Sequence, residues 1–325
     1  MNILIINPAR TQPHTGNRTT SERWARLMRD LGHHVEVAHD WTGPTQAKDC
    51  DLLVTLHARR SFPTLERFHR ARPGVPVVVA LTGTDLYQDI QTSPEARQSL
   101  EVASRLVVLQ PRAVEALPTR FRGACQVIYQ SAETAGPPEK PPENVFRVCV
   151  LAHLRAVKDP LRAAYAARDL PPDSRIQVAH AGGVLDAELA GEAEAEQRRN
   201  SRYCWFGDLP RDCALRLLAG SHVLALTSQL EGGANVVSEA IAAGVPVLST
   251  SIPGSLGILG DGYPGYFPAG DTRALSLLML RAETDPAFYG ELKRRIDELR
   301  FLVDPRRERE SWHELLNEVS RSAVL

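Results

Sequence analysis

Residues 222–250 read HVLALTSQLEGGANVVSEAIAAGVPVLST, and this stretch predicts how the chain folds. It opens with an apolar run that is typical of a buried strand. It continues through a loop into a helix rich in small residues, which stops at Gly244, and it ends in a second apolar strand. The expected elements are a strand over 222–227, a loop over 228–233, a helix over 234–243 and a strand over 245–249. This order favours a parallel sheet in an α/β domain.

The loop of this stretch predicts a ligand site. Its residues Glu231–Asn235 lie between the carboxyl end of a strand and the amino end of a helix, where ligands of open parallel sheets bind. Free backbone N–H groups there favour an anion, and Gly232 and Gly233 permit close approach. The carboxylates of Glu231 and Glu239 accept hydrogen bonds, so they favour a hydroxyl group of a ligand over a phosphate. A nucleotide sugar carries both chemistries, whereas the alternative is a tight loop with two solvated glutamates.

The length, net charge and cysteine content of the sequence limit the class of protein that it can be. With 325 residues the chain is long enough for two domains, and its net charge of −1 carries no global bias toward nucleic acid or anionic lipid. The five cysteines are scattered without a C-x-x-C pair, which predicts a reducing cytoplasm and neither disulfides nor a zinc site. The amino terminus lacks the features of a signal peptide, and no apolar run is long enough to span a bilayer.

The first half of the chain predicts one α/β domain over residues 1–131. Strands are expected over 2–7, 33–39, 51–57, 75–81, 105–109 and 126–129, with helices over 19–31 and 64–71 among the connections. Three of these strands end in polar or glycine-rich segments, which a parallel sheet gathers along one edge. The side chains expected around one cleft are Arg10, His14, Arg18, His57, Arg59, Arg60 and Asp85.

Four arginines facing one carboxylate indicate an anionic ligand at this edge. Each residue also has a simpler interpretation. Arg59 and Arg60 could begin a solvated helix, Asp85 could be an ordinary N-cap, and His14 could be an exposed loop residue.

The second half repeats the α/β pattern after a proline-rich linker over 132–144. Strands are expected over 145–154, 175–180 and 203–206 before the stretch quoted first, and helices over 161–168, 271–284 and 285–301. The charge-rich helix over 187–199 is expected to be a solvated face. The domains are therefore expected at 1–131 and 145–301, followed by an amphipathic C-terminal segment over 302–325.

The spacing of Glu231 and Glu239, followed by Ala240 and the Gly-Val-Pro-Val strand, resembles the paired-glutamate motif of retaining glycosyltransferases with the GT-B fold. The resemblance implies two Rossmann-like, doubly wound domains facing an interdomain cleft, with the C-terminal helix crossing back to the first domain. It also implies that Glu231 contacts the donor sugar and that Glu239 binds the nucleotide ribose.

Other segments extend the resemblance. Gly16 and Asn17 match the loop beside the donor phosphates, and the Gly-Thr-Asp turn that contains Thr84 and Asp85 matches a turn near the acceptor. Residues 152–159 match the family's phosphate turn at Leu154 and Lys158 but depart from it at Ala152, His153 and Asp159. The resemblance implies donor-site roles for His153, Arg155, Lys158, Gly207, Asp208, Leu209, Gly232, Gly233, Ala234 and Asn235.

Several strings resemble the selenosugar synthases of selenoneine biosynthesis across nearly the whole chain. They are residues 16–20, 56–61, 81–87, 153–155 with 158–160, and 231–235. That family transfers a hexose from a UDP-sugar to selenophosphate. The resemblance implies a small anionic acceptor bound by Arg10, Arg18, Arg59, Thr84 and Asp85.

The expected catalytic residues are Lys158, Glu231 and His57. A lysine and a helix amino end aimed at the departing diphosphate would make a metal unnecessary. The Asp49-Cys50-Asp51 segment opens a strand and is expected at the opposite edge of the sheet. His57 and His14 are candidates for a general base, which an anionic acceptor would not need.

Three other functions remain open: a hexosyltransferase with a saccharide or lipid acceptor, a sugar-nucleotide epimerase, and a nucleotide-sugar-binding protein without turnover. A dehydrogenase is disfavoured because no G-x-G-x-x-G motif follows the first strand.

Overall fold

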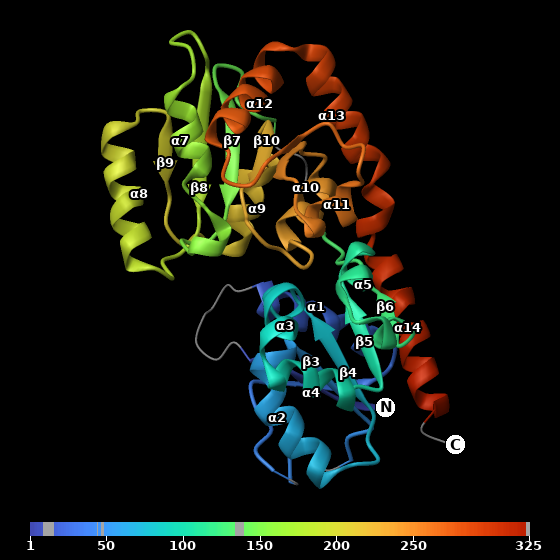
Figure 1. The fold of residues 1–325 in the computed structure, drawn as a ribbon. Coiled ribbons are helices and arrows are strands. Elements are labelled where there is room, and N and C mark those ends of the chain that lie inside the picture. The colour runs from blue at the N-terminus through green and yellow to red at the C-terminus, as the bar shows by residue number, and fades with distance from the viewer. Residues whose placement is uncertain (9–15, 44, 47–48, 134–139, 323–325) are drawn as a thin grey trace. The chain divides into compact units, whose positions relative to one another are not determined.

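The computed structural model describes residues 1–8, 16–43, 45–46, 49–133 and 140–322. Arg10 and His14 lie outside the described residues. The chain divides by its contacts into two compact units (Figure 1). Unit 1 comprises Met1–Gln130, Glu231–Asn235 and Pro305–Leu325, and unit 2 comprises Ser131–Leu230 and Val236–Asp304.

Unit 1 is built on a parallel sheet, which in the described part of the chain has six strands in the order β2-β1-β3-β4-β5-β6. The strands are β1 (Asn2–Ile6), β2 (His34–Ala38), β3 (Leu52–Leu56), β4 (Val77–Leu81), β5 (Arg105–Val108) and β6 (Cys125–Val127). Its helices are α1 (Gly16–Asp30), α2 (Ala58–Ala71), η1 (Asp85–Asp89, a π-helix), α3 (Ile90–Thr92), α4 (Pro94–Val102), α5 (Arg112–Ala116), α6 (Thr119–Arg122) and α14 (Pro305–Ser322).

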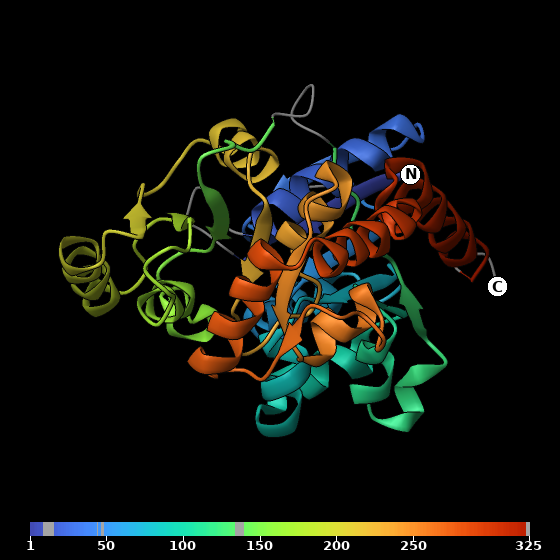
Figure 2. The ribbon, with the colours of Figure 1, turned by 90° about the horizontal axis from the view of Figure 1, so that it is seen from above.

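Both faces of this sheet are buried, because successive strand residues alternate between two cores. Ile3 and Ile5 of β1 pack on the side of α1 and α14, where Trp24 and Trp312 are fully buried. Leu4 and Ile6 pack on the side of α2 and α4. The C-terminal helix α14 therefore forms part of the core of unit 1, beside α1 (Figure 2).

Unit 2 is built on a second parallel sheet, with six strands in the described residues and the order β12-β11-β10-β7-β8-β9. The strands are β7 (Phe146–Leu151), β8 (Ile176–Ala181), β9 (Tyr203–Trp205), β10 (Val223–Leu226), β11 (Val247–Thr250) and β12 (Tyr266–Phe267). Its helices are η2 (Ala156–Lys158), α7 (Arg162–Arg168), α8 (Ala187–Arg199), α9 (Arg211–Ala219), α10 (Asn235–Ala243, whose first residue groups with unit 1), α11 (Pro253–Leu259), α12 (Thr272–Thr284), α13 (Pro286–Glu298) and η3 (Arg300–Val303).

The strand orders locate a ligand crevice in each unit. In a doubly wound sheet the crevice opens at the carboxyl ends of the two strands where the winding reverses direction. These are β1 and β3 in unit 1, and β7 and β10 in unit 2. The predicted parallel sheets and doubly wound α/β fold are confirmed.

One expectation for a helix was wrong. The helix expected to begin near Thr64 begins at Ala58, with Pro63 inside it and His57 as its N-cap, which agrees with the alternative that Arg59 and Arg60 begin a helix. The helix α8 is largely solvated, as expected, but not uniformly so. Glu196 on this helix is fully buried, and its carboxylate accepts hydrogen bonds from Arg168, Arg199 and Asn200. A buried carboxylate needs such partners.

No helix in the described ranges combines the length and apolar character needed to cross a membrane.

Candidate active site

In unit 2, two predicted segments leave neighbouring strands at the crevice. The turn of Lys158 follows β7, and the chain leaves β10 at Thr227 before it reaches Glu231. Lys158 is the last residue of the 3-10 helix η2, for which Arg155 is the N-cap in an extended conformation. Since β7 and β10 pair with each other, the sheet places the carboxyl end of each strand beside the other.

His153 and the glycines after β8 form the next part of this edge. The Nδ1 atom of His153 accepts the backbone N–H of Gly183 at 2.9 Å, so the imidazole joins the two strand ends. A Cβ atom at Gly182 would lie 1.8 Å from the carbonyl oxygen of Ala152, which explains why the position requires glycine. Asp208 lies against Gly183, where a Cβ atom would come within 3.2 Å of its carboxyl carbon.

The turn predicted beside the nucleobase follows β9. Gly207 has φ 69°, in the left-handed region, and its carbonyl oxygen accepts the N–H of Gly182 at 2.8 Å. Leu209 is half-buried and Asp208 is exposed. The predicted residues Gly207, Asp208, Leu209 and His153 are therefore gathered at the β7–β8–β9 edge of unit 2.

Glu239 lies in α10 with only 9% of its surface exposed. Its Oε1 atom is 2.8 Å from a guanidinium nitrogen of Arg211, the first residue of α9. This partner was not predicted, because nothing in the local pattern around Arg211 indicates a contact with a residue 28 positions away.

The glycine-rich segment Glu231–Asn235 has its contacts in unit 1. The side-chain amide of Asn235 donates to the carbonyl oxygen of Gly16 at 3.3 Å and to the hydroxyl of Thr20 at 3.2 Å. Its oxygen accepts from Arg23 at 3.0 Å. Gly16 and Asn235, both predicted at the donor site, are thus in contact, but the side chain of Asn235 is already engaged.

Gly232 and Gly233 in the same segment are packed too tightly for larger residues. A Cβ atom at Gly232 would lie 2.5 Å from the carbonyl oxygen of Thr82, and one at Gly233 would lie 2.5 Å from the Cβ atom of Leu109. Within unit 1 the segment therefore lies against the turn after β4. Glu231 and Ala234 on either side are largely buried.

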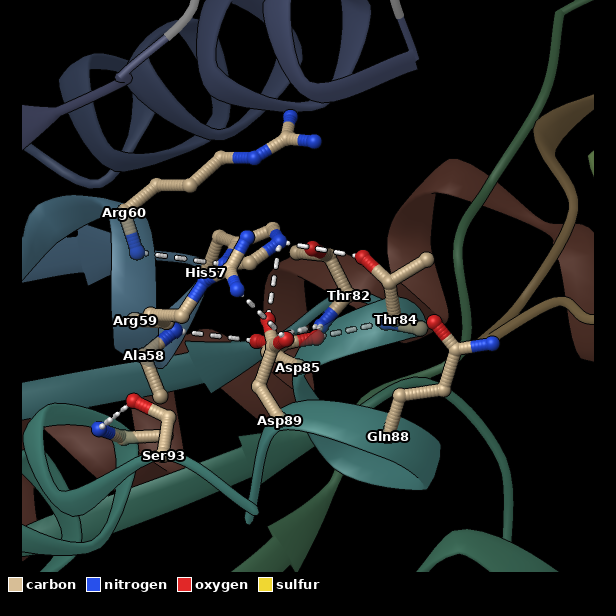
Figure 3. Close-up of polar contacts among 12 residues, drawn as sticks. His57, Ala58, Arg59, Arg60, Thr82, Thr84, Asp85, Gln88, Asp89 and Ser93 are labelled. Carbon is tan, nitrogen blue, oxygen red and sulfur yellow. Dashed lines mark hydrogen bonds and ion pairs between the residues drawn. The ribbon is translucent and has the colours of Figure 1, made fainter. Parts of the chain in front are cut away.

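His57 is the centre of the cluster drawn in Figure 3. It caps α2 with φ 71° and ψ 99°, a conformation that L-residues seldom adopt and that is retained mainly at functional positions. Its Nδ1 atom accepts the backbone N–H of Arg60 at 3.3 Å, which places the ring proton on Nε2, 3.0 Å from the hydroxyl of Thr84. Burial lowers the pKa of His57, although the charge of Asp85 opposes this effect.

This geometry revises the expected role of His57 as a general base. The nitrogen that would accept a proton already accepts a backbone N–H group, and the side chain is almost completely buried. His57 is placed to hold Thr84 and the first turn of α2, so we assign it to positioning.

Asp85 accepts three backbone N–H groups from two segments of the chain (Figure 3). Its carboxylate accepts the N–H groups of Ala58 at 3.0 Å, Thr82 at 2.9 Å and Gly83 at 2.8 Å, and the residue is fully buried. With both oxygens engaged, Asp85 holds the crevice in shape instead of contacting an acceptor. It is not an ordinary N-cap either, because it lies inside the π-helix η1.

Asp89 completes the cluster and was missed by the sequence analysis. Its Oδ1 atom is 3.2 Å from the guanidinium of Arg59, and its Oδ2 atom is 3.8 Å from Nε2 of His57. Oδ2 is buried without a hydrogen-bond partner among the described residues. The guanidinium of Arg60 extends away from both carboxylates in Figure 3.

Arg18 is not part of this cluster. It lies on α1, half-exposed, and pairs with Glu22 one helical turn away at 2.8 Å. Asn17 is next to it in the first turn of α1. Arg18 lies in the first turn of α1, which follows β1 and so begins at the same carboxyl edge as Arg59 and Arg60, but the guanidinium of Arg18 is paired along its own helix.

The possible metal segment Asp49-Cys50-Asp51 lies where predicted, at the amino end of β3. Asp51 accepts the N–H of Asn2 at 2.7 Å, at the edge opposite His57. Within the described ranges no group of three or more His, Cys, Asp or Glu side chains could hold a metal ion. All five cysteines are free.

The whole fold is similar to several solved structures. HepE of Anabaena in complex with UDP-glucose has a TM-score of 0.80 at 17% identity, over 98% of this chain and 100% of that one. Sucrose-phosphate synthase of Thermosynechococcus elongatus has a TM-score of 0.76 at 15% identity, over 99% of each chain. An E. coli structure described as trehalose-6-phosphate bound with UDP-2-fluoro glucose has a TM-score of 0.72 at 12% identity, over 98% of this chain and 99% of that one. These likenesses show the fold, which is GT-B.

Residues 132–299, more than half of the chain, match the family described as glycosyl transferases group 1. The matched region contains the turn of Lys158, the paired glutamates and the Arg211–Glu239 ion pair. The protein belongs to the group 1 glycosyltransferases and is a transferase with the GT-B fold.

Proposed function

We propose that the protein transfers a hexose, glucose or N-acetylglucosamine, from a UDP-sugar to selenophosphate in the cytoplasm, and that the seleno-sugar formed enters selenoneine biosynthesis. The donor class is supported by family membership and by the UDP-glucose, UDP and UDP-2-fluoro glucose present in similar structures. The acceptor rests on the resemblance and on the two arginines described next.

The observation that carries the acceptor is the amino end of α2. A helix amino end is already electropositive, and acidic residues commonly offset it. The first turn of α2 contains no acidic residue but has Arg59 and Arg60 beside the cap His57. Half of the Arg59 side chain is exposed. Asp89 pairs with Arg59, and Asp85 accepts the N–H of Ala58 at the same helix end, so two carboxylates balance the two arginines. The exposed residues Arg59 and Arg60 beside the β1/β3 crevice are compatible with a small anionic acceptor, whose identity rests on the resemblance.

We assign the donor to the residues gathered at the unit 2 crevice. Lys158 would bind the diphosphate, Glu239 the ribose hydroxyls, and the backbone of residues 207–209 the base. Arg211 holds the carboxylate of Glu239 in place. The resemblance assigns the hexose hydroxyls to Glu231, which groups with unit 1. No metal is required by this arrangement, because a lysine and helix amino ends can stabilise the leaving diphosphate.

The transfer exchanges one bond for another. The selenium of selenophosphate attacks the anomeric carbon, so a carbon–selenium bond forms, with the selenium–phosphorus bond intact, while the bond from that carbon to the UDP oxygen breaks. The electron pair leaves with UDP, and no oxidant or reductant is involved. Since the acceptor is already anionic, the step needs no general base, which agrees with the engaged nitrogens of His57.

The test is UDP release from UDP-glucose and UDP-N-acetylglucosamine, with and without selenophosphate, with mass detection of selenium-containing products. Release that depends on selenophosphate and yields a seleno-sugar is the expected result. Inorganic phosphate is the matched anion control, because it is a tetrahedral phosphorus anion without the selenium nucleophile. UDP binding without this release would contradict the acceptor and leave the donor assignment intact.

A second candidate has one observation in its favour. The buried Oδ2 atom of Asp89 has no hydrogen-bond partner among the described residues, and a sugar hydroxyl could donate to it. A hexosyltransferase with a saccharide or sugar-phosphate acceptor would use this oxygen. Glucose, glucose 6-phosphate and fructose 6-phosphate tested as acceptors in the same UDP-release assay distinguish the two candidates.

A further inference from the structure

The turn that carries Lys158 has an unusual backbone in unit 2. Asp159, the residue directly after the lysine, has φ 43° and ψ 51°. This is the left-handed region, which glycine adopts readily and other residues adopt only when their surroundings hold them there. Contacts with surrounding residues must therefore hold the backbone of Asp159 in this conformation.

An ion pair holds the turn from one side. The carboxylate of Asp159 accepts from Nε of Arg162 at 2.8 Å and from a second guanidinium nitrogen at 3.3 Å. The remaining nitrogen of the same guanidinium donates to the hydroxyl of Thr272, the first residue of α12, at 2.7 Å. The carboxylate of Asp159, the guanidinium of Arg162 and the hydroxyl of Thr272 therefore connect the turn to α12.

Thr227 holds the turn from the other side. It is the residue after β10 and is 2% exposed. Its hydroxyl hydrogen is shared between the carbonyl oxygens of Lys158 at 3.0 Å and Asp159 at 2.8 Å. Two residues further on, the N–H of Gln229 donates to the carbonyl oxygen of Val157 at 2.9 Å. The chain that leads into the glycine-rich segment is therefore bonded to the backbone on both sides of Lys158.

We infer that Thr227, together with the Asp159–Arg162 pair, positions Lys158 against the diphosphate of the donor. This inference deepens the proposed function and rests on it. Lysine has a long, flexible side chain, and a charge stabilises a transition state best when it needs no reorganisation. Fixing the backbone at Lys158 reduces that reorganisation, and the bonds from Thr227 hold the turn at the end of β10 in unit 2.

Two substitutions at Thr227 test the inference. Thr227→Val removes the hydroxyl at nearly constant volume, and Thr227→Ser retains it. We expect Thr227→Val to weaken UDP binding, measured by titration calorimetry, about tenfold, the size of effect that one buried hydrogen bond to a carbonyl produces. Thr227→Ser should bind UDP within about twofold of the unsubstituted protein, a difference of a few tenths of a kcal/mol.

A double-mutant cycle separates positioning from general loosening of the fold. If Thr227 acts through the lysine, Thr227→Val should have almost no further effect on UDP affinity in a Lys158→Met background. Arg162→Met, tested in the same two backgrounds, should behave in the same way. Equal losses in both backgrounds, or unchanged UDP affinity in Thr227→Val, would overturn the inference.

The readout does not depend on the acceptor. If the unsubstituted protein binds UDP but transfers nothing to selenophosphate, the acceptor proposal fails while the cycle still tests the role of Thr227. If it does not bind UDP, both the donor assignment and this inference are refuted.

Discussion

Arg211 and Glu239 form an ion pair in unit 2, with a guanidinium nitrogen 2.8 Å from the carboxylate oxygen Oε1. The glutamate is nearly buried, whereas 47% of the arginine side chain is exposed. The glutamate expected to accept hydrogen bonds from the ribose is thus fixed by a residue on a different helix.

Arg211→Ala should lower the affinity for the UDP-sugar donor while changing the stability of the fold little. Half-exposed ion pairs contribute roughly 0–1 kcal/mol to stability, so we expect the melting temperature to change little. The freed carboxylate would lose its fixed orientation, and the KM for UDP-sugar should rise roughly threefold to tenfold, about 1 kcal/mol. Arg216→Ala, an exposed arginine of the same helix, is the matched control. Equal KM values for the two variants would contradict this role.

Asp85→Asn should destabilise the protein strongly. The carboxylate accepts three backbone N–H groups, and an amide would direct its own N–H toward at least one of them. Leaving buried donors unsatisfied costs about 2–4 kcal/mol in total. Chemical denaturation measures the loss. Asp51→Asn, at an exposed carboxylate with a backbone N–H contact, should cost less than about 1 kcal/mol. Similar losses in the two variants would show that Asp85 is not the anchor described.

His180 should make stability depend on pH in the acidic range. Burial lowers the pKa of this histidine to about 4, and the neutral ring accepts from Tyr203 and donates to the carbonyl oxygen of Ala152. The unfolded chain takes up the proton near pH 6.5, so the free energy of unfolding should fall as pH drops from about 6.5 to about 4. The full effect is about 3 kcal/mol.

Denaturation curves at several pH values in this range measure that slope. His180→Gln, which can retain both hydrogen bonds without titrating, should flatten it. His34→Gln, at an exposed histidine, is the control and should leave the slope unchanged. The same slope in His180→Gln as in the unsubstituted protein would refute the assignment to His180.

Two substitutions at Trp312 should have very different effects. The ring is fully buried on α14 and packs edge-to-face on Trp24, with centroids 4.7 Å apart. Its N–H has no hydrogen-bond partner among the described residues. Trp312→Ala should cost about 3–5 kcal/mol through the cavity it leaves. Trp312→Phe removes the unsatisfied donor and should lie within about 1.5 kcal/mol of the unsubstituted protein. Chemical denaturation measures the free energy of unfolding of the two variants. Equal losses of stability would contradict the conclusion that packing of the aromatic ring stabilises this core.

The sequence was most informative where the signal is local. Apolar runs, helix-terminating glycines and the proline-rich stretch predicted most strands, the parallel sheets and the repeated α/β pattern. These features depend on residues that are close together in the sequence, where the periodicity of strands and helices can be detected. The short strand β12, the helix α11 and the first turn of α2 were not predicted. A two-residue strand has no periodicity to detect, and a helix that begins near Arg59 was only the alternative interpretation of that segment.

The sequence by itself determined the two α/β halves, their parallel sheets and the segments that reach the carboxyl edges. It could not determine which side chains meet there. Asp89 contacts His57, Arg211 contacts Glu239, and the hydroxyl of Thr227 is bonded to the turn of Lys158. Each pair is distant along the chain, and each is brought together by strand order and helix packing. Only the tertiary structure decides such contacts, because burial and partner geometry, and not residue type, set what a polar side chain can do.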